Sequence, residues 1–400
     1  MPTIILFDNH VREELLPLTY TRPVGELRVG LLTIKEKWEK WLNASAHYIT
    51  QDYLAGKYGL DYSDDNYVIN ASVLPSEQLC ELIRQMGNNE AYLKDDELIV
   101  AKVGVKQLEK LIKDEEIEEL KGMDVQDTEY DKINHLWNLI QLNDKAIRDD
   151  FRLLTKGRSS AKISSSNQLI NPEAIFVEEG ANVEGSFLNA KEGPIYIGKQ
   201  AQVMEGSTLR GSIGIADFAT VRMGSRIYGG TTIGPYCKVG GEVINSILYR
   251  YANKSHEGFL GQSYLGEWCN IGADTNTSNL KNDYSEVKLW NYPAGRFVKT
   301  NTQFLGLIMG DHAKTGINTM LNTGTVIGVA ANIFGSGYPR PFIPSFAWGG
   351  AHGYQTYKLE KAFGMSERMM ERRNVKFTPE ERLIMLRVFE DTAKFRRWEK

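Results

Sequence analysis

Hydrophobic positions recur with a period of six between about residues 160 and 336. From Ile197 to Val239 every sixth residue is aliphatic without a break, and the residue four positions later is usually small. Amphipathic helices and simple strands have periods of 3.6 and 2, so neither produces this pattern. A period of six predicts a left-handed parallel β-helix, a prism of triangular coils whose aliphatic residues point inward and stack from coil to coil. The unbroken ladder is Ile197, Val203, Leu209, Ile215, Val221, Ile227, Ile233 and Val239.

Shorter ladders extend the repeat on both sides. One runs from Ile163 to Phe187 and another from Met309 to Ile333. Between them, residues 277–305 form a long, polar, tyrosine-containing insertion. A long insertion in an otherwise strict repeat usually carries function. The predicted β-helix domain therefore spans residues 160–336 and has a functional interruption near its C-terminal end.

Residues 1–155 alternate between strand and helix patterns. This β-α-β rhythm predicts an α/β domain with parallel strands, ending at a polar linker over residues 155–160. The expected strands are Ile4–Phe7, Tyr67–Asn70 and Leu98–Val103, and the expected helices are Leu31–Leu42, Ser76–Met86 and Val105–Leu120.

Residues 337–400 begin with a proline-rich extended segment and continue as two helices, Leu359–Arg373 and Pro379–Lys400. Thr378 is the expected N-cap of the second helix, with Glu381 completing a capping box. We expect these helices to cap the open end of the β-helix or to contact a neighbouring subunit.

Composition and charge narrow the functional classes. The chain has 400 residues, enough for two domains, and a net charge of −4 with acids and bases mixed throughout. That balance argues against nucleic acid or an anionic membrane as a partner. Three widely spaced cysteines argue against a disulfide framework or a zinc site, and no metal ligand set is predicted. The N-terminus lacks the pattern of a signal peptide, so a cytoplasmic protein is expected.

A motif near the N-terminus carries a first resemblance. Residues 15–24, LLPLTYTRPV, resemble the signature of sugar-1-phosphate nucleotidylyltransferases. The pattern is degenerate: no glycine-rich loop precedes it, Val24 replaces the family's lysine, and Asn70-Ala71 replaces its Gly-Asp metal ligand. The resemblance implies a shortened nucleotidylyltransferase-like domain, with Arg12 and Arg22 as candidate phosphate ligands. It implies Mg²⁺ only if this domain is active; the alternative is a decayed or repurposed domain with surface arginines.

A second resemblance covers residues 240–335, which are similar to the acetyltransferase half of the two-domain sugar-1-phosphate nucleotidylyltransferase/N-acetyltransferases. It rests on His256, on the run Asn270-Ile271-Gly272-Ala273-Asp274-Thr275, and on Gly310-Asp311-His312-Ala313-Lys314-Thr315-Gly316-Ile317-Asn318. It implies a homotrimeric hexapeptide-repeat acyltransferase that uses acetyl-CoA as co-substrate. The implied acceptor is an amino-sugar phosphate or a sugar nucleotide.

The same resemblance implies roles for individual residues. His256 would be the general base, because an attacking amine must lose a proton and histidine has a pKa suited to that task near neutral pH. The implied acceptor-binding residues are Asn270, Asn279, Lys288, Lys254 and Phe259. The implied CoA-binding residues are Ala273, Lys314 and Gly316, and the C-terminal arginines Arg372, Arg373, Arg396 and Arg397 are further candidates for the CoA phosphates. His312 occupies a turn position of the repeat and is expected on the surface.

Departures from the family pattern leave alternatives open. Phe259 stands where the family has tyrosine, Ile244 where it has a phosphate-binding lysine, Gly240 where some members have arginine, and Asp274 where it has glycine. These changes weaken anion binding, and they point to an altered acceptor or to lost activity. The alternatives are a nucleotidylyltransferase whose β-helix serves mainly for trimerisation, and a non-catalytic relative.

Overall fold

The computed structural model describes residues 2–113, 115–117 and 119–399 and divides into two compact units. The first unit comprises the residues up to Leu15 together with Thr21–Leu27 and Leu32–Asn138. The second comprises Leu16–Tyr20, Arg28–Leu31 and the chain from Leu139 onward. Two short stretches of the N-terminal sequence thus pack with the second unit.

The first unit is an α/β layer with a six-stranded sheet of order β2-β1-β3-β5-β4-β6. The predicted parallel pairing is found between β1 and its neighbours β2 and β3, and between β4 and β6, whereas β5 runs antiparallel to β3 and β4. Its strands are β1 (Thr3–Phe7), β2 (Ala46–Ile49), β3 (Asp65–Asn70), β4 (Glu90–Lys94), β5 (Glu97–Gly104) and β6 (Lys121–Asp124). Its helices are α1 (Val11–Glu14), α2 (Ile34–Leu42), α3 (Asp52–Ala55), α4 (Glu77–Gln85) and α5 (Val105–Ile112).

Side-chain caps mark the starts of two helices in this unit. Thr33 and Glu36 form a reciprocal capping box at the start of α2, and the Ser76 hydroxyl accepts from the Leu79 amide at the start of α4. The helix expected over Val105–Leu120 ends at Ile112. Residues 114 and 118 of that expected helix lie outside the described part of the chain.

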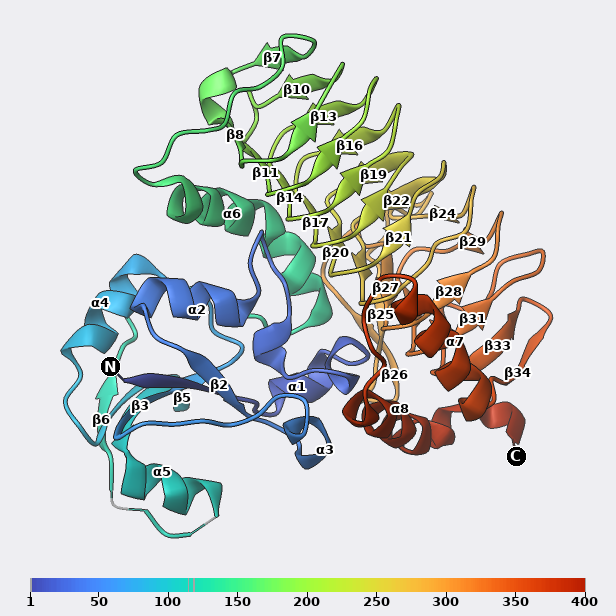
Figure 1. Cartoon of the computed structure of the whole chain (residues 1–400). Coiled ribbons are helices and arrows are strands. Elements are labelled where there is room, and N and C mark those ends of the chain that lie inside the picture. The colour runs from blue at the N-terminus through green and yellow to red at the C-terminus, as the bar shows by residue number, and fades with distance from the viewer. Residues whose placement is uncertain (1, 114, 118, 400) are drawn as a thin grey trace. The chain divides into compact units, whose positions relative to one another are not determined.

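The second unit contains the predicted left-handed parallel β-helix, about ten turns long (Figure 1). Each coil contributes a short strand to each of three faces, which we name the β7 face, the β8 face and the β9 face after their first strands. The β7 face consists of β7 (Gln168–Ile170), β10 (Phe187–Asn189), β13 (Thr208–Arg210), β16 (Arg226–Tyr228), β19 (Glu242–Ile244), β22 (Phe259–Gly261), β24 (Asn276–Thr277) and β29 (Met320–Leu321). The β8 face consists of β8 (Ile175–Val177), β11 (Ile195–Ile197), β14 (Ile213–Ile215), β17 (Thr231–Ile233), β20 (Ile247–Leu248), β23 (Tyr264–Leu265), β27 (Leu307–Met309), β30 (Thr325–Ile327) and β32 (Phe342–Ile343). The β9 face consists of β9 (Asn182–Val183), β12 (Gln202–Val203), β15 (Thr220–Val221), β18 (Lys238–Val239), β21 (Asn253–Lys254), β28 (Lys314–Thr315), β31 (Asn332–Ile333) and the hairpin of β33 (Ala347–Gly350) with β34 (Gly353–Thr356).

The ladder residues fill the prism as predicted. Ile197, Leu209, Val221 and Ile233 are all buried in one continuous core, and Cys237 and Cys269 are buried among them. Residues of successive strands stand in register, for example Leu209 opposite Ile227 and Val221 opposite Val239. Each coil is therefore held by backbone hydrogen bonds to its neighbours and by a stacked aliphatic column.

The corner between the β8 and β9 faces places non-glycine residues in the left-handed backbone region. Eight residues in successive coils adopt φ between 52° and 60° there: Gln200, Phe218, Tyr236, Tyr251, Trp268, His312, Ala330 and Phe346. This conformation is costly for residues with a β-carbon. Four of them stack as an aromatic column, with successive ring centroids 4.9, 4.7 and 4.1 Å apart, and the stacking offsets part of that cost.

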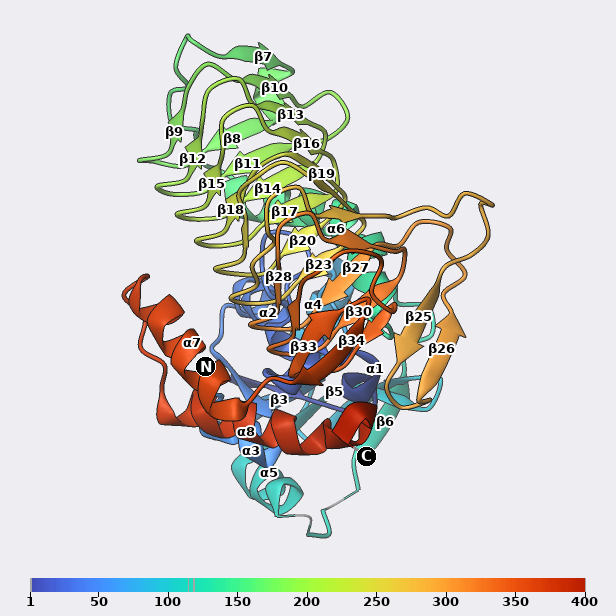
Figure 2. The ribbon, with the colours of Figure 1, turned by 90° about the vertical axis from the view of Figure 1, so that its right-hand side faces the viewer.

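The C-terminal segment packs along this corner and beyond it (Figure 2). Helices α7 (Leu359–Glu371) and α8 (Pro379–Asp391) follow the last coils, and Thr378 and Glu381 form the predicted capping box. The Ser366 hydroxyl lies 3.1 Å from Nδ1 of His312, which is buried. The expectation of a surface position for His312 is therefore wrong, because α7 covers that turn. Trp398 packs against the end of the core.

The remaining elements flank the coils. Helix α6 (Leu136–Thr155) meets the β8 face, where the Asn143 side chain donates to the Gly230 carbonyl over 2.6 Å. The insertion expected over residues 277–305 contains the antiparallel hairpin β25 (Lys288–Asn291) and β26 (Arg296–Lys299). Short 3-10 helices occur at Leu18–Tyr20, Val24–Glu26, Pro172–Ala174, Ala393–Phe395 and Arg397–Glu399.

The inward ladder gives a direct stability prediction. Ile227→Ala removes a buried side chain from the stacked column, and we expect a loss of about 2–5 kcal/mol in the free energy of unfolding, measured by chemical denaturation. Tyr228 of the same strand points outward, so Tyr228→Ala is the matched control and is expected to cost less than about 1 kcal/mol. Equal losses would contradict the inward and outward assignment.

Candidate functional site

His256 lies at the corner between the β9 and β7 faces, after β21 and before β22. It is exposed, and within the described residues its imidazole makes no hydrogen bond or ion pair. The residues before and after it are held by the coil, since the His256 carbonyl accepts from Nζ of Lys254 over 2.8 Å. The side chain thus projects from a fixed backbone with both ring nitrogens free to meet a substrate.

The corner that carries His256 also carries two of the predicted CoA-binding residues in the next two coils. Ala273 and Gly316 follow the β9 face at equivalent turns. The Ala273 carbonyl accepts from the Asn318 amide, and the Glu257 carbonyl accepts from the Asp274 amide, so the three turns are hydrogen-bonded neighbours. A β-carbon on Gly272 would lie 2.4 Å from the Gly316 carbonyl carbon, so only glycine permits this close stacking.

Asn270 lies on the β9 face beside that corner. Its backbone bridges Asn253 on one side and Lys314 on the other. Its side-chain oxygen accepts from the Asn253 amide over 2.7 Å, and Asn253 in turn accepts from the Ser255 hydroxyl over 2.5 Å. This string orients the Asn270 side chain so that its own NH2 group remains available.

Phe259 and Asn279 lie on the other side of the corner, along the β7 face. A β-carbon on Gly261 would lie 2.7 Å from both the Phe259 ring and the Asn279 amide nitrogen, so these two side chains converge above that glycine. The Asn279 amide also donates to the Gln262 side chain. The described chain therefore distributes the predicted acceptor residues over two faces that diverge from His256.

Lys254 requires a correction. It was a candidate for binding the acceptor's phosphate, but it occupies an inward ladder position opposite Val239 and is 1 % exposed. Its ammonium donates to the carbonyls of Gly240 and His256, at 2.9 and 2.8 Å. Burial lowers its pKa to about 8. A group enclosed in this way supports the His256 turn from inside the prism and presents nothing to a surface ligand.

The other two predicted lysines are not brought to His256 by any described contact. Lys314 is turned back on its own corner, donating to the carbonyls of Trp268 and His312, and burial lowers its pKa to about 8. Lys288 begins strand β25 of the inserted hairpin, with its side chain exposed.

Arg12 and Arg22 belong to the first unit and are both buried. Arg12 donates to the Tyr53 hydroxyl over 2.5 Å and lies 3.8 Å from the Asp8 carboxylate. Asp8 also accepts from the Val24 amide and the Thr50 hydroxyl, and burial raises the pKa of its carboxyl group. The expectation of surface arginines at these two positions is wrong, because both side chains are buried, that of Arg12 beside Asp8 after β1.

Charged residues that the sequence did not single out lie on the coils preceding His256. Arg226 on the β7 face pairs with Glu242 and Glu257, at 3.6 and 3.0 Å. Arg222 is exposed at the same corner as His256, two coils earlier, and Lys238 lies on the outer side of the β9 face. Their spacing in sequence gives no signal by itself, because the coils place them on the β7 face, at the corner and on the β9 face, around the turns that precede His256.

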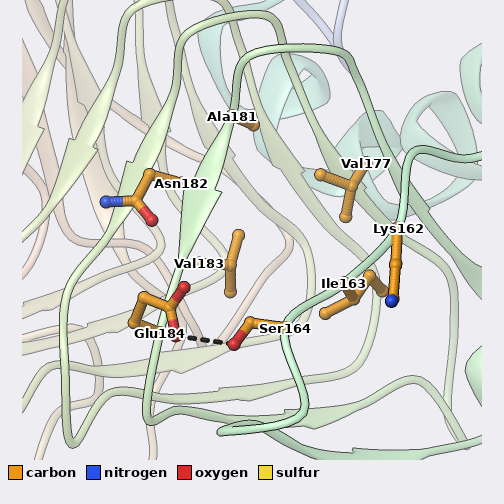
Figure 3. A pocket seen from close by; sticks show the side chains of 8 residues that line it. All are labelled: Lys162, Ile163, Ser164, Val177, Ala181, Asn182, Val183 and Glu184. Atoms are coloured by element: carbon orange, nitrogen blue, oxygen red, sulfur yellow. Dashed lines mark hydrogen bonds between the residues drawn. The ribbon is translucent and has the colours of Figure 1, made fainter.

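A separate hollow opens at the N-terminal end of the β-helix (Figure 3). Ser164 donates to the Glu184 carboxylate there over 2.7 Å, and no predicted site residue lines it. Its lining consists of Lys162, Ile163, Ser164, Val177, Ala181, Asn182, Val183 and Glu184. Over residues 2–113, 115–117 and 119–399 no group of three or more metal-ligating side chains occurs, and no helix there is long and apolar enough to cross a membrane.

Comparison with known proteins finds similarity to sugar nucleotidyl transferases and to bifunctional transferases. Residues 4–159 match the family model described as sugar nucleotidyl transferase. The bifunctional protein GlmU of Methanocaldococcus jannaschii is 38% identical over 87 residues, 22% of this chain and 21% of that protein. The bifunctional sugar-1-phosphate nucleotidylyltransferase/acetyltransferase of Sulfurisphaera tokodaii is 33% identical over 93 residues, 23% of each. The resemblance predicted from the sequence is confirmed.

The similarity is partial. The matched region spans less than a quarter of the length of these two transferases. Among solved structures, a UDP-N-acetylglucosamine acyltransferase of Francisella novicida aligns with a TM-score of 0.29 at 15% identity, covering 54% of this chain and 76% of that one.

Lys254 provides a pH test of the local geometry. Burial lowers its pKa from 10.5 to about 8, so between these values the unfolded chain binds more protons and the free energy of unfolding should rise with pH. The Lys254→Met variant lacks the titrating group, so this contribution to the pH dependence of stability is absent from it. Relative to Lys254→Met, we expect the wild type to gain up to about 3 kcal/mol of stability between pH 8 and 10, measured by denaturation at each pH. Parallel pH profiles for the two proteins would contradict the buried position.

Proposed function

We propose that this protein is an acetyl-CoA-dependent N-acyltransferase acting on an amino-sugar phosphate or a sugar nucleotide, with His256 as the general base. The observation that carries the proposal is the corner column: His256, Ala273 and Gly316 occupy the same corner in three successive coils. The Sulfurisphaera tokodaii relative, a bifunctional sugar-1-phosphate nucleotidylyltransferase/acetyltransferase, supports the reaction class.

The reaction needs a base, an anchored donor and an oriented acceptor. His256 removes the proton of the acceptor's ammonium group, the amine attacks the thioester carbonyl, and the C–S bond breaks to release CoA as its thiol once the thiolate takes up a proton. Histidine suits this role at neutral pH without a strongly perturbed environment. The fixed backbone around His256 limits the positions that the ring can take, which favours a productive geometry.

The two-sided arrangement favours a site shared between copies of the chain. Asn279 and Phe259 flank His256 on the β7 face, whereas Asn270 flanks it on the β9 face. One ligand cannot lie flat on two diverging faces of a single prism. We propose a homotrimer in which the His256 corner of one copy meets a face of the next, so that both sets of residues reach one cleft. A cytoplasmic location fits these substrates.

The proposal assigns binding of the acceptor to Asn270, Asn279, Phe259 and the hairpin residue Lys288. It assigns binding of CoA to Ala273, Lys314 and Gly316. Lys314 would contact CoA by packing rather than through its charge, because its ammonium group already donates hydrogen bonds to two carbonyls. Lys254 is not retained as a phosphate ligand.

Removal of the base tests the proposal. We expect His256→Ala to lower the rate of acetyl transfer at least about 100-fold, read as free thiol released from acetyl-CoA over a panel of amino-sugar phosphates and sugar nucleotides. His352→Ala is the matched control, since His352 is also exposed but lies in the β33–β34 hairpin, and it should keep the wild-type rate. Full activity in His256→Ala would overturn the assignment.

A second candidate, sugar-1-phosphate nucleotidylyl transfer by the first unit, is favoured by the family model that matches residues 4–159. It would require Mg²⁺, and it must work without a glycine-rich loop and with Arg12 and Arg22 buried. We expect little pyrophosphate release from nucleoside triphosphates and sugar 1-phosphates with Mg²⁺. Release that is rapid and unchanged in His256→Ala would establish this second activity and assign the β-helix mainly to assembly.

A further inference from the structure

Four cations gather on the N-terminal side of the His256 corner. Arg222 stands at that corner two coils before His256, and Lys238 stands on the β9 face one coil before it, in register with Asn253. Arg372 and Arg373 reach the same region from the C-terminal end of α7. We name this group the basic cluster. It occurs in a chain whose net charge is −4.

Arg373 is fixed in place and ties α7 to the coils. Its guanidinium donates to the Tyr236 carbonyl over 2.5 Å and lies 5.7 Å from the centre of the Tyr251 ring. Lys238 follows Tyr236 by two residues on the next face. The end of α7 therefore forms one edge of the outer surface that carries Lys238.

Arg222 approaches the His256 turn across Gly240. The position of a β-carbon on Gly240 would lie 3.4 Å from Cβ of Arg222 and 2.4 Å from the carbonyl oxygen of Ser255, the residue before His256. The backbone of the His256 turn therefore approaches Gly240 closely, and Arg222 lies on the other side of the same glycine. With glycine at position 240, no side chain stands between Arg222 and that turn.

Among the residues that the structure describes, no acid is found paired with the basic cluster. Burial lowers the pKa of Lys238, and the charges of Arg373, Arg222 and Arg372 lower it further. The nearby acids Glu242 and Glu257 pair instead with Arg226 on the β7 face. Cations at a helix C-terminus stabilise the helix, which accounts for Arg372 and Arg373 but not for Arg222 and Lys238 on the coils. Like charges held together without a counter-ion favour binding of an anion.

We propose that Arg222, Lys238 and Arg372, held in place by Arg373, bind the phosphate group of the acceptor. This inference rests on the proposed acetyl transfer and names its acceptor-anchoring site. Ala273 and Gly316, the proposed CoA contacts, lie on the C-terminal side of His256, whereas the basic cluster lies on its N-terminal side. An acceptor whose phosphate binds at the cluster can extend past His256 toward Asn270 and leave the Ala273 and Gly316 turns to CoA. The basic cluster would replace the arginine and the lysine of the resembled family, whose positions are held by Gly240 and Ile244 in this chain.

Equilibrium dialysis with pyrophosphate as the probe tests the site without any turnover. At low ionic strength we expect Arg222→Gln and Lys238→Gln each to raise the Kd about tenfold and the double variant about 100-fold, because each removes a charge-assisted contact. Lys199→Gln is the matched control, because Lys199 is exposed at the corner between the β8 and β9 faces, two coils before Lys238. This variant should bind pyrophosphate with the Kd of the wild type. Equal Kd values for the wild type and the double variant would overturn the proposal, as would an equal loss in the control.

Steady-state kinetics then separates the two phosphate-bearing substrates. We expect the single variants to raise the KM for the sugar-phosphate acceptor about tenfold and to leave the KM for acetyl-CoA unchanged. A raised KM for acetyl-CoA with an unchanged acceptor KM would assign the cluster to CoA and overturn the acceptor assignment. Unimpaired acetyl transfer in His256→Ala would reject the proposed base, while the dialysis result would still decide the anion site.

Discussion

Stacking of the inward aliphatic ladder is the constraint on which the second unit depends. Each coil is too small to bury its own hydrophobic residues, so Leu209, Ile227 and their equivalents are buried only because the coils above and below stand in register. That register fixes the outer positions as well. A residue one coil away in the chain becomes a neighbour in a column, and the candidate site is built from such columns.

The same constraint explains why one corner can hold both a base and its substrates. The turns bearing His256, Ala273 and Gly316 lie at one corner in three successive coils, and backbone hydrogen bonds join each turn to the next. Lys254 reinforces the first of these turns from inside the prism, where it replaces an aliphatic ladder residue. Placing a buried cation there carries a desolvation cost, which its two carbonyl partners only partly offset.

Helix α7 and the two arginines that follow it are joined to the coils by specific polar contacts. The helix covers His312 by way of Ser366 and holds the aromatic column by way of Arg373. Phe218, at the free end of that column, is 47 % exposed. The helix therefore protects the middle of the column and delivers two arginines to the region beside Lys238, linking a structural contact to the proposed anion site.

The sequence by itself determined the β-helix, the burial of its aliphatic ladder and the capped start of α8, because a period of six has few physical solutions and each aliphatic ladder residue reports its own direction. It also indicated the α/β layer, although β-α-β rhythm alone did not reveal that β5 runs antiparallel, since strand direction depends on connections rather than composition. Only the tertiary structure decided which polar residues share a surface. Lys254 is a candidate surface cation in the sequence, but it is a buried ladder residue in the fold. His312 is covered by a helix about fifty residues away in the chain. Coil stacking and the path of α7 make neighbours of Arg222, Lys238 and Arg372. Side-chain direction and long-range packing set the surroundings of a charge, and a local pattern contains neither.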